Sequence, residues 1–112
     1  MGKSNLDRSQ LISVAKLFAI LAEPTRLEIL QQLNEGTRSV GELVERLDAK
    51  QANVSKQLGI LHEAELVVRE RRGSQVFYSI SEPMVFDLCS LVCRKLHRDA
   101  ERRAELFRSS QR

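Results

Sequence analysis

The sequence has few of the residues that form disulfides and aromatic cores. Its 112 residues include two cysteines, two prolines, four phenylalanines, one tyrosine and no tryptophan. Two cysteines only four positions apart are expected to be free thiols in a reducing compartment rather than a structural disulfide. Because aromatic side chains are so scarce, the hydrophobic core is predicted to be aliphatic.

Long apolar segments and enzyme motifs are also missing. No apolar run approaches the roughly 20 residues that cross a bilayer, and the N-terminal segment MGKSNLDRSQ has no apolar centre like that of a signal peptide. A cytoplasmic protein without a membrane partner is therefore predicted. The chain has no glycine-rich phosphate loop, serine nucleophile motif or conventional zinc spacing, and His62 and His97 fall in different predicted helices. We therefore expect no enzymatic activity.

The charge of the chain is small but unevenly distributed. The net charge is +3, and the segment RERR at 69–72 precedes Gly73 and Ser74. A second set of basic residues follows Cys93 and comprises Arg94, Lys95, Arg98, Arg102, Arg103, Arg108 and Arg112. Acidic residues at 99, 101 and 105 are interleaved with this second set, which favours a solvated helix face there over a nucleic-acid contact.

Apolar spacing predicts three helices in the first half of the chain. Residues 9–21 repeat apolar side chains at intervals of three and four, as an amphipathic helix does. Pro24 is suited to the first position of a second helix that ends at Gly36, and the residues predicted to face inward are Leu27, Leu30 and Leu33, with Ile29 alongside. Ser39 and Glu42 have the spacing of a capping box that opens a short helix at about 40–47.

A fourth helix is predicted over residues 50–64. Val54, Leu58 and Leu61 recur on one face, which is expected to pack inward. The opposite face carries Ala52, Lys56 and Gly59, with Asn53 and Ser55 on its flanks and with Gln51 and Gln57 nearer the buried margin. This outer face is polar but small, which suits a helix that fits closely against another molecule.

The pattern changes after the fourth helix. Val68 and the run Val76, Phe77, Tyr78 and Ile80 are β-branched or aromatic, and the glycine turn RRGS between them predicts a two-stranded hairpin. A last helix is predicted from Pro83 onward. The order describes a mainly α fold with a small β-hairpin wing, a winged helix-turn-helix: one domain over 1–112, with the helix-turn-helix at about 40–64, the wing at about 66–80 and the last helix at about 83–108.

The segments LFAILAEPTRLEILQQL and SVGELVERLDAKQANVSKQLGILHEAELVVRERRGSQVFYSI resemble the ArsR/SmtB family of metal- and stress-responsive repressors over roughly 65 residues. The resemblance implies a homodimer formed largely by the first and last helices. It also implies binding to double-stranded DNA at an imperfect palindrome, and release when an inducer binds. By position, the residues expected to face the DNA groove are Gln51, Asn53, Ser55, Lys56 and Gln57, and Arg71 and Arg72 are expected to reach the DNA from the wing.

The inducer sites of the family are largely absent. Many relatives carry cysteines in the short third helix, where this chain has none, and sulfur-responsive relatives have a cysteine in the second helix, which is also missing here. Zinc-binding relatives use an acidic residue and histidines along the last helix. Asp87 matches the first of these ligands, but Cys89 replaces the next, and the later positions fall on Ala100 and Arg103.

The remaining candidate sensor is the segment DLCSLVCRKLH, in which Cys89, Cys93 and His97 form a stripe at intervals of four. Side chains four apart on a helix have Cβ atoms about 5–6 Å apart, whereas a disulfide needs about 3.5–4.5 Å. A bridging soft atom therefore requires less distortion than a direct disulfide. Thiolates prefer soft partners such as arsenite, antimonite, copper(I) or a sulfur chain. Arsenite needs a third donor, which a cysteine of a second chain or an external thiol supplies better than His97.

Three roles for Cys89 and Cys93 follow from the sequence, and none of them requires an obligatory cofactor. The cysteines bind a thiophilic inducer, sense oxidants or persulfides, or act as small buried hydrophobic residues. In the last case the protein is a DNA-binding repressor whose signal enters elsewhere, and a constitutive repressor without a ligand is a separate alternative. A further alternative is a winged helix that binds proteins instead of DNA.

Overall fold

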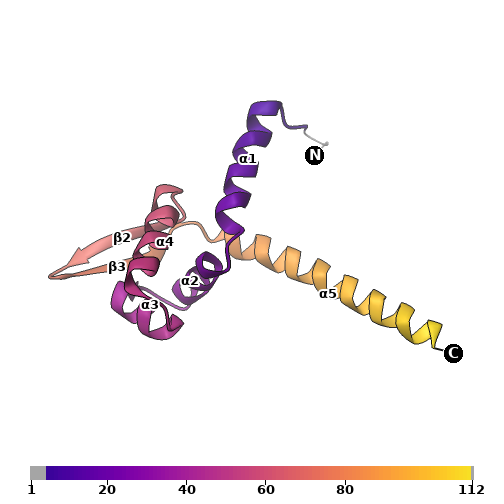
Figure 1. The fold of residues 1–112 in the computed structure, drawn as a ribbon. Coiled ribbons are helices and arrows are strands. Elements are labelled where there is room, and N and C mark those ends of the chain that lie inside the picture. The colour runs from indigo at the N-terminus through magenta and orange to yellow at the C-terminus, as the bar shows by residue number, and fades with distance from the viewer. Residues whose placement is uncertain (1–4, 112) are drawn as a thin grey trace. The chain divides into compact units, whose positions relative to one another are not determined.

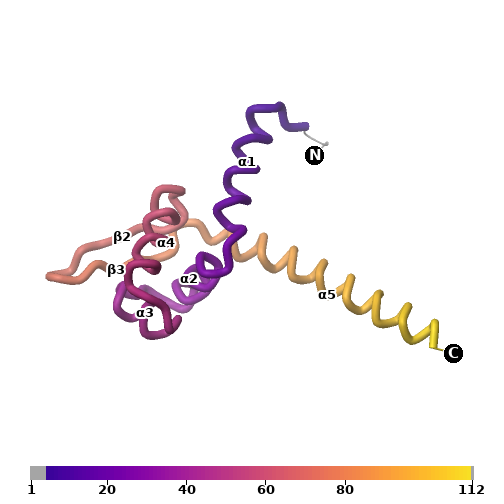
Figure 2. The backbone as a smooth tube through the Cα atoms, in the orientation of Figure 1, coloured from indigo at the N-terminus to yellow at the C-terminus, as the bar shows by residue number. Residues whose placement is uncertain are grey.

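The computed structural model describes residues 5–111, which form two compact units, one ending at Ser81 and the other beginning at Glu82. The first unit contains α1 (Arg8–Leu21), α2 (Pro24–Asn34), β1 (Arg38–Ser39), α3 (Val40–Leu47), α4 (Gln51–Glu63), β2 (Val67–Arg72) and β3 (Gln75–Ile80). The second unit is the single helix α5 (Met84–Ser110). Figures 1 and 2 show the fold as a ribbon and as a backbone tube. The predicted mainly helical fold with a small β wing is confirmed.

Side chains at the helix starts account for where α1, α2 and α3 begin. The Asp7 carboxylate accepts a hydrogen bond from the Gln10 N–H, and the Gln10 side chain accepts one from the Asp7 N–H, both at 2.9 Å. Helix α2 begins at Pro24, and the Glu23 side chain caps its start by accepting a hydrogen bond from the Arg26 N–H. The capping box predicted for α3 is confirmed, because Glu42 N–H donates to Ser39 Oγ at 3.2 Å and Ser39 N–H donates to Glu42 Oε1 at 2.9 Å.

The sheet has three antiparallel strands in the order β1, β3, β2, so the prediction of two strands was incomplete. Strand β1 has only two residues and pairs Arg38 with Tyr78 and Ser39 with Phe77. Two residues are too few to show an alternating pattern in the sequence. The β2–β3 turn follows the prediction: Gly73 has φ +63° between the paired residues Arg72 and Gln75, as the first position of a type II′ turn requires.

The core of the first unit is aliphatic, as predicted. The side chains that are fully buried include Ile29, Leu43, Val54, Leu58 and Leu61, and Tyr78 is the one aromatic residue among the buried side chains of residues 5–111. The inward faces of α2 and α4 therefore meet in one core, and α4 buries the three residues that its spacing predicted.

One core prediction for α2 was wrong. Leu27 is 37% exposed, whereas Ile29 is completely buried. Leu30 and Leu33 are buried as expected. The inward face of α2 therefore lies along Ile29, Leu30 and Leu33, and Leu27 lies at its edge.

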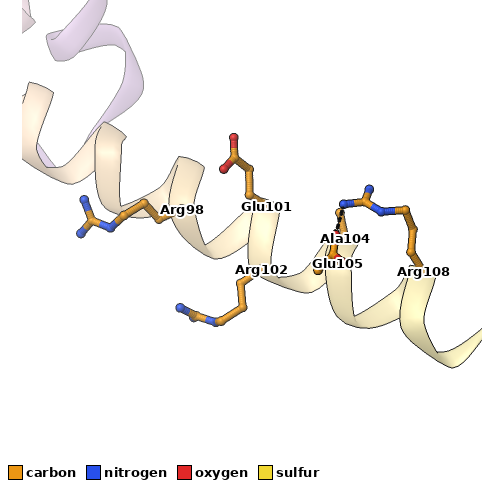
Figure 3. Close-up of a pocket in the computed structure, with 6 residues that line it drawn as sticks. All are labelled: Arg98, Glu101, Arg102, Ala104, Glu105 and Arg108. Atoms are coloured by element: carbon orange, nitrogen blue, oxygen red, sulfur yellow. Dashed lines mark hydrogen bonds and ion pairs between the residues drawn. The ribbon is translucent and has the colours of Figure 1, made fainter.

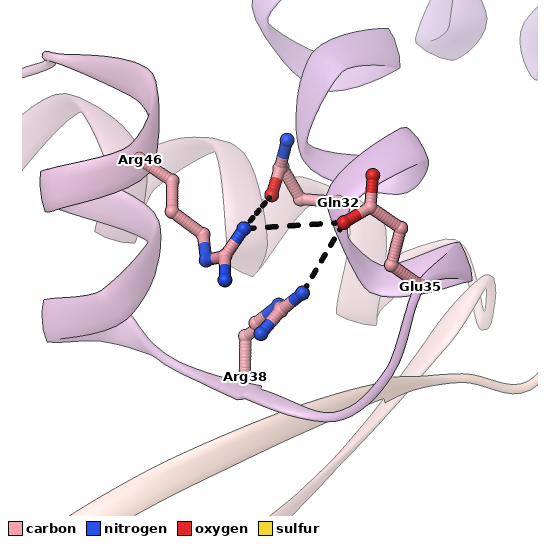
Figure 4. Close-up of polar contacts among 4 residues, drawn as sticks. All are labelled: Gln32, Glu35, Arg38 and Arg46. Atoms are coloured by element: carbon pink, nitrogen blue, oxygen red, sulfur yellow. Dashed lines mark hydrogen bonds and ion pairs between the residues drawn. The ribbon is translucent and has the colours of Figure 1, made fainter.

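A polar cluster joins the end of α2 to β1 and α3 (Figure 4). The Arg38 guanidinium lies 3.3 Å from Glu35 Oε1, and the Arg46 guanidinium lies 3.9 Å from the same oxygen. Arg46 also donates a hydrogen bond of 3.4 Å to the side-chain oxygen of Gln32. The Glu35 carboxylate thus pairs with two arginines and ties the first helix of the helix-turn-helix to α2.

The sequence predicts no apolar segment long enough to cross a bilayer. Within the part of the chain that the structure describes, no helix is both long enough and apolar enough to cross a bilayer.

Candidate DNA interface and sensor cysteines

The turn between α3 and α4 presents one side of α4 to solvent. Asp48 ends α3 with φ 50°, a left-handed conformation, and α4 begins at Gln51. The exposed residues of α4 include Gln51, Asn53, Ser55 and Lys56. Four of the five residues predicted to face the DNA groove are therefore accessible on this helix.

The fifth residue, Gln57, does not lie on the exposed face, so its predicted place there was wrong. Its side chain is only 7% exposed. Its amide oxygen accepts a hydrogen bond of 2.7 Å from the Arg26 guanidinium, and its amide nitrogen donates one of 3.0 Å to Asn53 Oδ1. Position 57 lies between the inward-facing Val54 and Leu61, which turns its side chain toward α2.

The basic residues of the wing differ in their surroundings. Both predicted residues, Arg71 and Arg72, are exposed on β2. Arg72 Nε lies 2.5 Å from Glu70 Oε1, and its guanidinium carbon lies 4.8 Å from the centre of the Phe77 ring. Arg71 makes no ion pair among residues 5–111. Its charge is therefore the more available of the two.

A third wing arginine was missed from the predicted DNA-contacting set. Side chains of a strand alternate between its faces, so Arg69 and Arg71 share one face of β2, while Glu70 and Arg72 share the other. Arg69 is exposed and has no ion pair within the described part of the chain. The alternation of RERR in a strand is the sequence signal that identifies it.

On α5, the cysteines lie along an apolar stripe. At about 100° per residue, Cys89 and Val92 lie within about 40° of Leu96 around the helix, and Cys93 lies about 60° away. Both cysteines are free and exposed. They therefore do not fill a core within the single chain, and Cys89 lies within the stripe whereas Cys93 lies at its edge.

His97 is less well placed for the sensor role proposed for it. It lies about 100° from Leu96 around the helix, and its Nε2 lies 2.8 Å from Glu101 Oε1. His97 and Cys93 line one shallow depression of α5, but Cys89 does not. Among residues 5–111, no three His, Cys, Asp or Glu side chains are grouped closely enough to hold a metal ion. One chain thus offers two thiols and no third ligand beside them.

The second half of α5 is a solvated face of paired charges. Asp99 receives hydrogen bonds from Lys95 and Arg102, and the bond from Lys95 is the main cause that lowers the pKa of Asp99. Arg108 pairs with Glu105 beside a shallow depression that residues of α5 line (Figure 3). These exposed pairs agree with the solvated face that the sequence favours, although Arg98 and Arg103 make no ion pair among residues 5–111.

Comparisons with known proteins identify the family. Residues 23–68, from the cap of α2 to β2, match the bacterial regulatory proteins of the arsR family. The chain is 39% identical over 85 residues to the HTH-type transcriptional regulator Rv0081 of Mycobacterium tuberculosis (strain ATCC 25618 / H37Rv), covering 75% of each protein. The crystal structure of M. tuberculosis Rv0081 superposes with a TM-score of 0.75 at 34% identity, over 88% of this chain and 99% of that one.

Two further solved structures share the fold. The AntR antimony-specific transcriptional repressor has a TM-score of 0.76 at 25% identity, over 90% of this chain and 92% of that one. The homodimeric winged helix-turn-helix DNA-binding domain of Mb0332 from Mycobacterium bovis has a TM-score of 0.70 at 29% identity, over 87% of this chain and 90% of that one. Together with the exposed α4 and the basic wing, these matches show that the chain belongs to the ArsR/SmtB family of DNA-binding transcriptional repressors and is not an enzyme.

Proposed function

We propose that this chain, as a homodimer, represses transcription from an imperfect palindromic operator and leaves the DNA when a thiophilic inducer binds Cys89 and Cys93. Arsenite and antimonite are the inducers that the two thiols fit best. The observation that carries this proposal is the pair of free, exposed thiols four residues apart on α5, beside an apolar stripe.

The DNA contacts are assigned to α4 and the wing. Gln51, Asn53, Ser55 and Lys56 are exposed on α4, and their short amide, hydroxyl and ammonium groups suit base edges and phosphates in a major groove. At the wing, the exposed residues Arg69, Arg71 and Arg72 are proposed to contact the DNA backbone or the minor groove. Arg69 joins the set because it shares a face of β2 with Arg71.

Homodimer formation is supported by apolar side chains that the single chain leaves exposed. These are Leu11 at 49%, Ile12 at 44% and Phe18 at 51% on α1, and Val92 at 49%, Leu96 at 60% and Phe107 at 64% on α5. Large apolar patches on a soluble protein usually mark an interaction surface. The homodimeric Mb0332 domain shares the fold, which supports a homodimer, and the exposed apolar side chains of α1 and α5 are the surface that we assign to it.

The spacing of the thiols favours an inserted ion over a disulfide. Cysteines four apart on a helix have Cβ atoms about 5–6 Å apart, so a direct disulfide bends the helix, whereas a bridging soft ion spans the gap. A cysteine of the partner subunit or a small external thiol supplies the third donor that arsenite or antimonite requires. The similarity to AntR, described as antimony-specific, favours a metalloid inducer.

Oxidant or persulfide sensing is the second candidate, because the exposure of both thiols serves it equally. It predicts an adduct that a reductant reverses, whereas a bound metalloid is removed by a competing dithiol chelator. The third reading, cysteines that only pack at the dimer interface, predicts no effect of any thiol reagent on DNA affinity.

Release requires only a modest change in dimer shape. Half-sites one helical turn apart place the two recognition helices about 34 Å from each other, so a small rotation misaligns one of them with its groove. A difference of about 3 kcal/mol in inducer affinity between the two dimer shapes lowers DNA affinity roughly a hundredfold.

The test combines native mass spectrometry with DNA-binding titrations. The fully reduced protein is exposed separately to arsenite, antimonite, zinc and a persulfide donor, and its affinity for a selected operator duplex is measured before and after. We expect arsenite or antimonite to add a defined mass to the dimer and to weaken DNA binding. The Cys89→Ser, Cys93→Ser double variant should bind DNA normally and respond to neither reagent.

The Ser90→Ala variant is the matched control, because Ser90 lies on the same helix between the two thiols and contributes no sulfur. It should respond as the wild type does. A double cysteine variant that still loses DNA affinity with the metalloid overturns the sensor assignment. A response to the persulfide donor alone, reversed by reductant, establishes the second candidate instead.

A further inference from the structure

Arg26 on α2 connects the end of α1 to the buried side of α4. Its Nε donates a hydrogen bond of 2.6 Å to the carbonyl oxygen of Ile20, and Nη2 donates one of 3.4 Å to that of Ala19. Nη1 donates the third, of 2.7 Å, to Gln57 Oε1. Three bonds to two helices fix both the position and the orientation of this guanidinium.

The Arg26 guanidinium determines which way the Gln57 amide points. A guanidinium has only donors, so the Gln57 atom that faces it must be the oxygen. The amide nitrogen of Gln57 then points to the other side, where it donates a hydrogen bond of 3.0 Å to Asn53 Oδ1. Because Gln57 is only 7% exposed, solvent does not readily replace these partners, and reversing the amide would set two donors against each other.

The Gln57 amide in turn determines which way the Asn53 amide points. The Asn53 oxygen is held by the Gln57 amide, so the NH₂ group of Asn53 is directed away from this contact. Asn53 is exposed on the side of α4 assigned to the DNA groove. The NH₂ group of Asn53 is therefore a hydrogen-bond donor that has no protein partner among residues 5–111.

We propose that Arg26 and Gln57 are positioning residues that hold the NH₂ group of Asn53 toward the DNA, so that Asn53 selects a base with an acceptor on its major-groove edge. This inference rests on the proposed entry of α4 into the groove. Guanine offers two acceptors, O6 and N7, while cytosine offers the N4 donor. The resulting specificity is guanine over cytosine at one position of each half-site.

The test is the substitution Gln57→Glu, which replaces the side-chain NH₂ group of residue 57 with an oxygen. A glutamate keeps the shape of glutamine and accepts the hydrogen bond from Arg26, but it has no donor for Asn53. Asn53 then turns its amide so that its nitrogen donates to Glu and its oxygen faces the DNA. The preference at the contacted base should change from guanine to cytosine.

The readout is base preference. Operators are selected from randomised duplexes with the wild-type protein, and each position is then substituted and measured by competition binding. We expect the wild type to favour guanine over cytosine about tenfold at the Asn53 position and the Gln57→Glu variant to reverse this order. Gln31→Glu on the exposed side of α2 changes the charge equally and should keep the wild-type preference.

A second variant keeps the test decisive if Gln57→Glu does not fold. Gln57→Met fills the same buried space without polar atoms and leaves the Asn53 amide free to turn, so the guanine preference should fall toward equality. Wild-type preference in a folded Gln57→Glu or Gln57→Met protein overturns the inference. If Asn53→Ala alters no base preference, the placement of Asn53 in the groove fails instead, and the two failures are therefore distinguishable.

Discussion

The carboxylate of Glu42 shows how a single residue makes the helix-turn-helix sensitive to acid. It accepts the hydrogen bond from Ser39 N–H, and this bond is the main cause that lowers the pKa of Glu42 below its usual value of 4.5. Because the folded-state pKa is lowered, the stabilisation is fully present above about 4.5, the unfolded value, and is lost as pH falls through the folded value.

The corresponding prediction compares wild type with Glu42→Gln. Glutamine keeps an acceptor for Ser39 N–H but carries no charge, so the variant should be less stable at pH 7 and approach the wild type in acid. Urea unfolding at a series of pH values from 7 down to 3 measures the difference. Glu45→Gln, an exposed residue of the same helix, is the matched control. A gap between wild type and Glu42→Gln that stays constant over this range contradicts the argument.

For individual side chains, the sequence predicts contacts between neighbours along the chain better than contacts between distant residues. The Ser39 and Glu42 capping box depends on residues three apart, so spacing alone revealed it. The direction of Gln57 depends on Arg26, which is 31 positions away, and no periodicity within α4 contains that partner. Helical periodicity predicts Gln57 at the buried margin of α4, and the hydrogen bond from Arg26 holds its side chain inward.

Whole elements were predicted where they have a long pattern. Helix α4 buries Val54, Leu58 and Leu61, as its period of three and four requires. Strand β1 has two residues and exists because β3 pairs with it, so the sequence carries no independent signal for it. The spacing of Cys89 and Cys93 along α5 follows from the sequence. The exposure of both thiols depends on which side chains pack against the helix, and spacing alone does not predict that.

The arginines of the wing differ in how freely their charges can reach a DNA phosphate. Arg71 has no ion pair among the described residues, whereas Arg72 is paired with Glu70 and lies against Phe77. Each basic residue that neutralises a phosphate contributes about one to the slope of log affinity against log salt. We expect Arg71→Ala to lower this slope by about one and Arg72→Ala to lower it by less.

Fluorescence anisotropy with an operator duplex between low and moderate salt gives both slopes. Arg98→Ala, on the face of α5 opposite the apolar stripe, removes the same charge from a residue outside the predicted DNA-contacting set and should leave the slope unchanged. If Arg72→Ala reduces the slope more than Arg71→Ala, the ion pair with Glu70 does not limit the contact of Arg72 with DNA.

For the whole molecule, the net charge of +3 is modest for a DNA-binding protein. Specific binding must therefore come from how the basic and polar groups are arranged. In the proposed homodimer, two copies double the number of contacts, so we expect tight operator binding to depend on dimer formation through the apolar stripe of α5.

Two leucines of α5 provide a matched pair for testing this dependence. Leu91 is 57% exposed and Leu96 is 60% exposed, but they lie about 140° apart around the helix. Leu96 shares the stripe of Val92, Cys89 and Phe107, so Leu96→Glu places a charge within the proposed interface and should convert the dimer to monomers at micromolar concentration. Leu91→Glu makes the same chemical change on another face and should remain dimeric.

Sedimentation equilibrium measures the oligomeric state of both variants, and the operator affinity of the Leu96→Glu protein should fall with the loss of the dimer. Monomers from Leu91→Glu and dimers from Leu96→Glu would move the interface to the opposite face of α5 and away from the cysteines.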